Sequence, residues 1–204
     1  MQSKLQIGIA GGIGAGKSVV CNIFRALGVP VYDADQMAKT IMVIDQSLIM
    51  AIKQTFGEES YFPDGSLNRQ YLAQQVFAKG ERIKELNALV HPRLEAHYQQ
   101  WANDALKEAP YVVKEAAILF QNGGYKQMDA SILVTCPVEK RIQRVLKRDP
   151  QRSESQVREI IGKQMSEERQ EALASLIVPN DGLQPILPTI LYWDECFRKG
   201  IMTP

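Results

Sequence analysis

The sequence predicts an α/β fold in three layers, with helices on both faces of a parallel sheet of about five strands. Two observations predict it. Short apolar runs alternate with segments of helical periodicity, the pattern of parallel strands connected by helices. The first apolar run, residues 5–10, leads directly into a glycine-rich loop and then a helix. A chain of 204 residues suits one domain that carries an inserted subdomain.

The composition predicts a cytoplasmic enzyme with no nucleic-acid or membrane partner. The 24 basic and 23 acidic side chains nearly cancel, so any phosphate site must come from local clustering. No apolar run approaches the ~18 residues of a membrane span, and no signal peptide is recognisable at the N-terminus. The cysteines fit a reducing compartment because they lack metal-site or disulfide spacing, and we expect them in the core: Cys21, Cys136 and Cys196.

The loop from Gly11 to Ser18 matches the pattern G-x-x-x-x-G-K-[ST] of P-loop NTPases. Its backbone N–H groups and the start of the following helix form an anion-binding nest. Lys17 would reach the β- and γ-phosphates of a nucleoside triphosphate, and the Ser18 hydroxyl would bind Mg²⁺. The alternative is a glycine-rich turn without a ligand. The predicted ATP-binding residues of this segment are Gly12, Gly14, Ala15, Gly16, Lys17, Ser18 and Val19.

A second strand is expected at residues 29–32, after a first helix that ends at Leu27 with Gly28 as its left-handed cap. It would deliver Asp33 and Asp35 to the edge of the sheet where the loop lies. A kinase that acts on a hydroxyl needs such a carboxylate to orient it and take its proton, so Asp33 is the catalytic candidate. Asp35 faces the same side only if the strand stays extended; otherwise it could cap the next helix.

Residues 36–109 read as helix after helix, and we interpret them as an inserted subdomain that binds the phosphoryl acceptor. The expected helices are 36–44, 46–56, 68–78, 81–90 and 93–108, with a turn at 63–65 and breaks at Gly80 and Pro92. Residues 1–35 and 110–204 would form the nucleotide-binding core. His91, before the proline, could bond backbone or face a ligand.

The rest of the core follows in order. Strands are expected at 111–114, 131–135 and 176–178, and helices at 138–148, 153–165 and 186–198. Ser153 and Gln156 have the spacing of a capping box, and residues 180–182 form a turn. Glu115, at the end of a strand, could reach the metal through water or simply pair with a surface lysine.

Arg141, Arg144 and Arg148 stand at i, i+3 and i+7, along one face of the predicted helix 138–148. Guanidinium groups suit phosphate geometry. With the break at Asp149-Pro150, this pattern predicts a lid over residues 141–165. The alternative is a solvated basic face.

In these motifs the chain resembles the dephospho-coenzyme A kinase family, along nearly its whole length. The resemblance rests on residues 9–18 (IAGGIGAGKS), 32–35 (YDAD), 86–92 (LNALVHP), 144–149 (RVLKRD), Gln164 and 180–182 (NDG). It implies Asp33 as base for the ribose 3′-hydroxyl and places Asp35, His91 and Pro92 on the acceptor side. It also implies a catalytic role for Arg144, a nucleotide contact for Arg148, and an adenine-side turn with Asn180 and Gly182.

Three positions depart from the family's usual pattern. Ala10 and Val19 stand where threonines are common, and Gln121 replaces an acid at the end of residues 117–121. The loop therefore lacks two hydroxyls beside the phosphates, and no catalytic or metal role is carried onto Gln121.

The resemblance implies ATP-dependent phosphorylation of dephospho-coenzyme A to coenzyme A. A P-loop kinase for another small acceptor, such as a nucleoside monophosphate or a sugar acid, is the alternative. A nucleotide switch is a third possibility, but the chain contains no D-x-x-G and no N-K-x-D motif.

Overall fold

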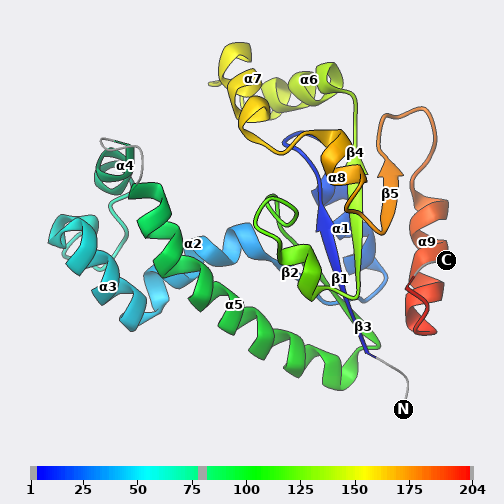
Figure 1. Ribbon diagram of the computed structural model, residues 1–204, viewed down its shortest axis with the longest axis horizontal. Coiled ribbons are helices and arrows are strands. Elements are labelled where there is room, and N and C mark those ends of the chain that lie inside the picture. The colour runs from blue at the N-terminus through cyan, green and yellow to red at the C-terminus, as the bar shows by residue number, and fades with distance from the viewer. Residues whose placement is uncertain (1–3, 78–81, 203–204) are drawn as a thin grey trace. The chain divides into compact units, whose positions relative to one another are not determined.

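The computed structural model describes residues 4–77 and 82–202 (Figure 1). It divides the chain into two compact units. The first contains the residues up to Asp33 and those from Ala102 onward, and the second contains Ala34–Trp101. We describe each unit in turn.

The first unit is built on a five-stranded parallel sheet, which confirms the predicted α/β fold. Its strands lie in the order β2-β3-β1-β4-β5. In the buried core, Ile7, Ile9, Val113 and Ile132 are fully inaccessible to solvent. The strands are β1 (Leu5–Ala10), β2 (Val31–Asp33), β3 (Tyr111–Glu115), β4 (Ala130–Thr135) and β5 (Leu176–Pro179).

Helices cover this sheet close to where they were predicted. Val20 and Phe24 of α1 and Ile190 and Phe197 of α9 enter the same core as the strands. The helices of this unit are α1 (Lys17–Ala26), α6 (Val138–Arg148), α7 (Glu154–Lys163), α8 (Glu167–Glu171) and α9 (Leu187–Arg198), with a short 3₁₀ turn η2 (Gly124–Gln127). Helix α8 was not predicted, because five residues are too few to show a helical period.

Several local predictions are confirmed. Gly28 follows α1 in the left-handed conformation, with φ of 78°. Ser153 and Gln156 form the expected capping box at the start of α7. The three cysteines are buried and free. No helix within residues 4–77 and 82–202 is long and apolar enough to cross a bilayer.

The second strand is shifted from its prediction. It covers Val31–Asp33 instead of residues 29–32. Pro30 has no N–H to donate and joins the sheet only through its carbonyl, which accepts from the N–H of Val113 at 3.0 Å. As a result Asp33 becomes the last residue of the strand.

The second unit is helical and has its own core. It contains α2 (Ala34–Ile44), α3 (Gln46–Phe56), the 3₁₀ turn η1 (Glu58–Ser60), α4 (Arg69–Phe77) and the first part of α5 (Arg82–Glu108). Asp45 caps α3 by accepting from the N–H of Leu48 at 3.0 Å. The core is formed by Ile41, Leu48, Ile52, Phe56, Tyr61, Leu72, Val76 and Val90.

The predicted break at Pro92 is wrong, since α5 runs through it without interruption. A proline inside a helix costs about 3 kcal/mol through the lost hydrogen bond and ring clash. On both sides of Pro92, however, apolar side chains pack into the helical unit's core, with Leu89 and Val90 before it and Leu94 after it. Fully burying one such side chain contributes about 1.5–3 kcal/mol. Val90 is buried and the two leucines are partly buried, so together they offset the proline. The predicted break at Gly80 lies outside the described residues.

Candidate active site

The phosphate loop connects β1 to α1 and curls around its own backbone. Gly14 and Gly16 have φ values of 77° and 99°, which L side chains rarely adopt. The N–H of Ala15 donates to the carbonyl of Gly12 at 3.1 Å and closes the turn. Lys17 starts α1, so the positive end of the helix dipole lies at the loop. Its Nζ donates to the carbonyl of Gly11 at 3.0 Å, while Ser18 and Val19 are exposed beside it.

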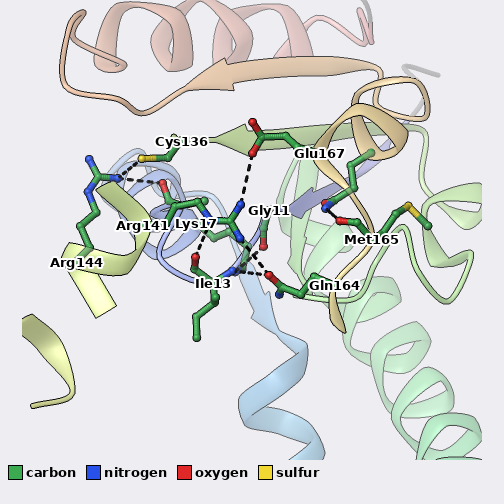
Figure 2. A network of polar contacts seen from close by, with 11 residues as sticks. Gly11, Ile13, Lys17, Cys136, Arg141, Arg144, Gln164, Met165 and Glu167 are labelled. Atoms are coloured by element: carbon green, nitrogen blue, oxygen red, sulfur yellow. Dashed lines mark hydrogen bonds and ion pairs between the residues drawn. The ribbon is translucent and has the colours of Figure 1, made fainter. Parts of the chain in front are cut away.

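Two side chains from distant segments hold the carbonyl of Ala15. Nη1 of Arg144, on α6, donates to it at 3.3 Å, and Nδ2 of Asn180, after β5, donates at 2.8 Å. Arg144 also donates to Sγ of Cys136 at 3.4 Å (Figure 2). A Cβ atom at Gly16 would lie 2.0 Å from Nδ2 of Asn180, so the amide packs directly on the loop. The structure thus brings two predicted nucleotide residues to the loop itself.

Arg141 lies in the same network, in a role that the sequence reasoning missed. Only 5% of the residue is exposed, and its Nε donates to the carbonyl of Ile13 at 2.9 Å. Its Nη2 donates to Oε1 of Gln164 at 3.2 Å, as Figure 2 shows. Burial lowers the pKa of Arg141, and Glu167 opposes that shift. Helical spacing placed Arg141 with Arg144 on one face of α6 but could not show that it turns under the loop.

A carboxylate pair closes the other side of the site. Asp33 at the end of β2 and Glu115 at the end of β3 are register partners in adjacent parallel strands, so their side chains leave the same face of the sheet. Both residues are partly buried. Burial raises the pKa of Glu115, the thiol of Cys21 lowers it by donating a hydrogen bond, and the charge of Asp33 raises it. Lys17 also acts on Glu115 and favours its charged form.

This environment predicts a stability change for Glu115→Gln. Below the carboxyl group's ordinary pKa of 4.5, Glu115 is neutral in the folded and unfolded chains alike. As the pH rises, the unfolded chain releases the proton first, so the folded state loses stability until its own raised pKa is passed. We therefore expect the Tm of Glu115→Gln to rise relative to that of the wild type as the pH increases from about 4.5 up to the raised pKa of Glu115.

Thermal unfolding of both proteins across this range checks the Glu115 prediction. The exposed Glu171→Gln serves as the matched control for the loss of one carboxylate. A difference in Tm between Glu115→Gln and the wild type that stays constant with pH would contradict a raised pKa at Glu115.

The remaining predicted residues lie apart from this network or in the helical unit. Because β2 ends at Asp33 and α2 begins at Ala34, Asp35 is not on an extended strand. It lies in the first turn of α2, where its negative charge interacts favourably with the positive end of the helix dipole. His91 and Pro92 lie within α5. Arg148, at the end of α6, is 62% exposed and pairs with Asp149 at 2.9 Å. Gly182 has a φ of 80° in the turn after β5.

Comparison with known proteins decides the family. The family model described as dephospho-CoA kinase matches residues 5–185. The chain belongs to the dephospho-CoA kinase family. A curated dephospho-CoA kinase from Bacteroides fragilis is 36% identical over 188 residues, which cover 92% of this chain and 90% of the relative.

Two solved structures share the fold of this chain. The crystal structure of TT1252 from Thermus thermophilus has a TM-score of 0.82 and 32% identity, and the match covers 95% of this chain and 97% of that one. The dephospho-CoA kinase from Campylobacter jejuni has a TM-score of 0.73 with 22% identity, covering 97% and 99% of the two chains. The second likeness shows the fold alone. The resemblance drawn from the loop and its companion motifs is confirmed.

Proposed function

We propose that the protein transfers the γ-phosphoryl group of ATP to the 3′-hydroxyl of dephospho-CoA, giving CoA and ADP in the last step of CoA synthesis. The observation that carries this proposal is the meeting of phosphate loop, Lys17 and Asp33 at one edge of the sheet, in a chain of the dephospho-CoA kinase family. Three buried free thiols fit a reducing compartment, and we place the enzyme in the cytoplasm.

The loop holds the triphosphate. Backbone N–H groups of the loop that are not already donated within the protein, as that of Ile13 is to Gln164, bind phosphate oxygens together with the N-terminus of α1. The ammonium of Lys17 leaves the carbonyl of Gly11 to reach the β- and γ-phosphates. Positive groups at this point stabilise the charge that spreads over the transferred phosphoryl oxygens.

Asp33 acts on the acceptor. Its carboxylate accepts a hydrogen bond from the 3′-hydroxyl and takes the proton as the hydroxyl oxygen bonds to the γ-phosphorus and the bond to the ADP oxygen breaks. The neighbouring Glu115 adds negative charge beside Asp33 whenever it is ionised. Asp35, His91 and Pro92 contribute to acceptor binding from the helical unit.

The residues at the loop fit a Mg²⁺ ion that is bound largely through phosphate. Among residues 4–77 and 82–202, no three histidine, cysteine or acidic side chains gather into a metal site. Ser18 offers a hydroxyl at the loop, and Glu115 offers a hard oxygen atom that could reach the ion through water, the ligand type that Mg²⁺ prefers. When bound, the ion neutralises charge on the β- and γ-phosphates.

Arg144 and Arg148 complete the nucleotide side. Arg144 already touches the loop through Ala15, so its guanidinium lies within reach of phosphate charge. Arg148, with most of its side chain in solvent, can close over the nucleotide and exclude water. Asn180 and Gly182 border the base side of the site.

A coupled assay of ADP formation with a panel of acceptors tests the function. With ATP and Mg²⁺, dephospho-CoA is expected to give rapid turnover, because only its ribose hydroxyl would be held beside Asp33. Nucleoside monophosphates and sugar acids are expected to give background rates. Preferred turnover of one of these acceptors would replace the proposal with a different P-loop kinase, and slow hydrolysis regardless of acceptor would indicate a nucleotide switch.

A further inference from the structure

Ile13, in the middle of the phosphate loop, is held in place through its carbonyl, its N–H and its side chain. Its carbonyl accepts from Nε of Arg141 at 2.9 Å, and its N–H donates to Oε1 of Gln164 at 3.1 Å. Its side chain packs against the apolar cluster between α6 and α7, formed by Ile142, Val145 and Val157. The loop is therefore joined to these two helices by one residue.

Arg141 shapes the loop by volume as well as by hydrogen bonds. A Cβ atom at Gly12 would lie 2.1 Å from its Nη2, and one at Gly14 would lie 2.5 Å from its carbonyl oxygen. The loop thus lies against both ends of this residue. Any movement of the guanidinium would release the peptide of Ile13 and open space beneath Gly12.

The contacts of Arg141 indicate that it holds the shape of the loop and does not offer its charge to a ligand. Nε and Nη2 bond to Ile13 and Gln164, and Nη1 lies 3.7 Å from Oε2 of Glu167. Each guanidinium nitrogen therefore faces a protein oxygen, and the carboxylate of Glu167 offsets the positive charge. Charged hydrogen bonds of this kind contribute more than neutral ones, and a planar fork sets geometry that an ammonium cannot.

We propose that Arg141 and Gln164 are positioning residues, which hold the phosphate loop in its triphosphate-binding shape through the peptide of Ile13. Gln164 directly follows α7, and Glu167 begins α8. The contacts that hold Arg141 and Ile13 therefore come from the short segment between these two helices. Gln170 fixes this segment by donating to the carbonyl of Met165 at 2.7 Å. A loop that is already held in this shape loses little conformational entropy when ATP binds. The inference rests on the proposed use of ATP.

Steady-state kinetics of Arg141→Met and Arg141→Lys test the proposal. Each variant loses the fork, so the KM for ATP and the Kd from direct ATP titration should rise about ten- to hundredfold, the effect of losing a charged hydrogen bond. The kcat at saturating ATP and the KM for dephospho-CoA should stay within about threefold of the wild-type values. The lost contacts hold ATP equally in the ground state and the transition state, so their loss weakens binding without slowing the chemical step. Lysine should rescue nothing, since it restores charge without geometry.

The split between KM and kcat separates positioning from a merely structural role. A variant that is only less stable gives less active enzyme, which lowers kcat and leaves the KM for ATP unchanged. That result, or full rescue by Arg141→Lys, would overturn the proposal. Arg198→Met is the matched control: this arginine on α9 donates to Asp194 at 2.8 Å and to the carbonyl of Leu27 at 2.9 Å, past the far end of α1 from the loop, and its loss should not change the KM for ATP.

Two milder variants keep the test decisive if Arg141 cannot be replaced in a folded protein. Gln164→Ala removes the acceptor shared by Ile13 and Arg141, and the new methyl group of Gly12→Ala displaces the guanidinium while Arg141 itself stays unchanged. Both variants should raise the KM for ATP while kcat stays near its wild-type value. A wild-type KM for ATP in both would refute the proposed positioning role of Arg141 and Gln164. A wild-type protein that neither binds ATP nor turns over dephospho-CoA would instead overturn the proposed function.

Discussion

Asp33→Asn is expected to lower kcat by roughly 10²–10⁴, the range for losing a general base. Asparagine keeps the size of the side chain and one acceptor oxygen, but it cannot take the proton of the attacking hydroxyl. Asp33 ends β2 beside Glu115 and makes no part of the loop that holds the triphosphate. ATP affinity should therefore stay within about twofold of the wild type, so that the defect lies in the chemical step.

Turnover at saturating ATP and dephospho-CoA, together with nucleotide titration, measures both halves of the Asp33 prediction. Asp64→Asn, at an exposed turn of the helical unit, is a control for the same change elsewhere and should be fully active. Near-wild-type turnover of Asp33→Asn would remove Asp33 as the base. A pH–rate profile that loses its acidic limb in the variant would support the assignment further.

Lys17→Ala is expected to weaken ATP binding and to lower kcat by about 10²–10³, the effect of removing one preorganised donor to developing charge. Nζ of Lys17 now donates to the carbonyl of Gly11, so alanine removes both a loop contact and the group that would move to the β- and γ-phosphates. AMP lacks those phosphates. Its affinity should therefore change little while that of ATP falls.

Parallel titrations with ATP and AMP check the Lys17 prediction. Lys17→Arg should restore little, because a planar fork does not fit the place of a compact ammonium. Lys199→Ala, which removes an exposed lysine paired with Glu195 on α9, should behave as the wild type. An unchanged ATP titration in Lys17→Ala would contradict the assignment of the loop as a triphosphate site.

Local pattern was enough to predict much of the candidate site. The loop motif predicts roles for Lys17 and Ser18 because glycines and a helix start at this spacing suit phosphate binding. The sequence also predicted that Asp33 lies at the edge of the sheet, although the strand was expected at residues 29–32 and begins only at Val31, after the proline. For Glu115 the sequence left two roles open, a contact with the metal through water and an ion pair with a surface lysine. Only the pairing of β2 with β3 in the structure showed that Glu115 lies beside Asp33.

Pro92 and Arg141 show where local pattern failed. A proline ordinarily ends a helix, but the core of the helical unit overrides that preference from both sides of Pro92. Basic residues on a helix ordinarily face solvent, but Arg141 turns inward to acceptors that lie far along the chain, at Ile13 and Gln164. Both errors come from contacts between distant residues.

The sequence by itself determined the fold class, the phosphate loop, the family and the principal catalytic candidates, since each depends on short-range periodicity or on a motif whose residues are close together. The tertiary structure alone decided what surrounds the loop. Arg144 and Asn180 meet at the carbonyl of Ala15, and Arg141 meets Gln164 at the peptide of Ile13. Such meetings depend on strand order and helix packing, which bring together segments more than a hundred residues apart, and no local pattern encodes them.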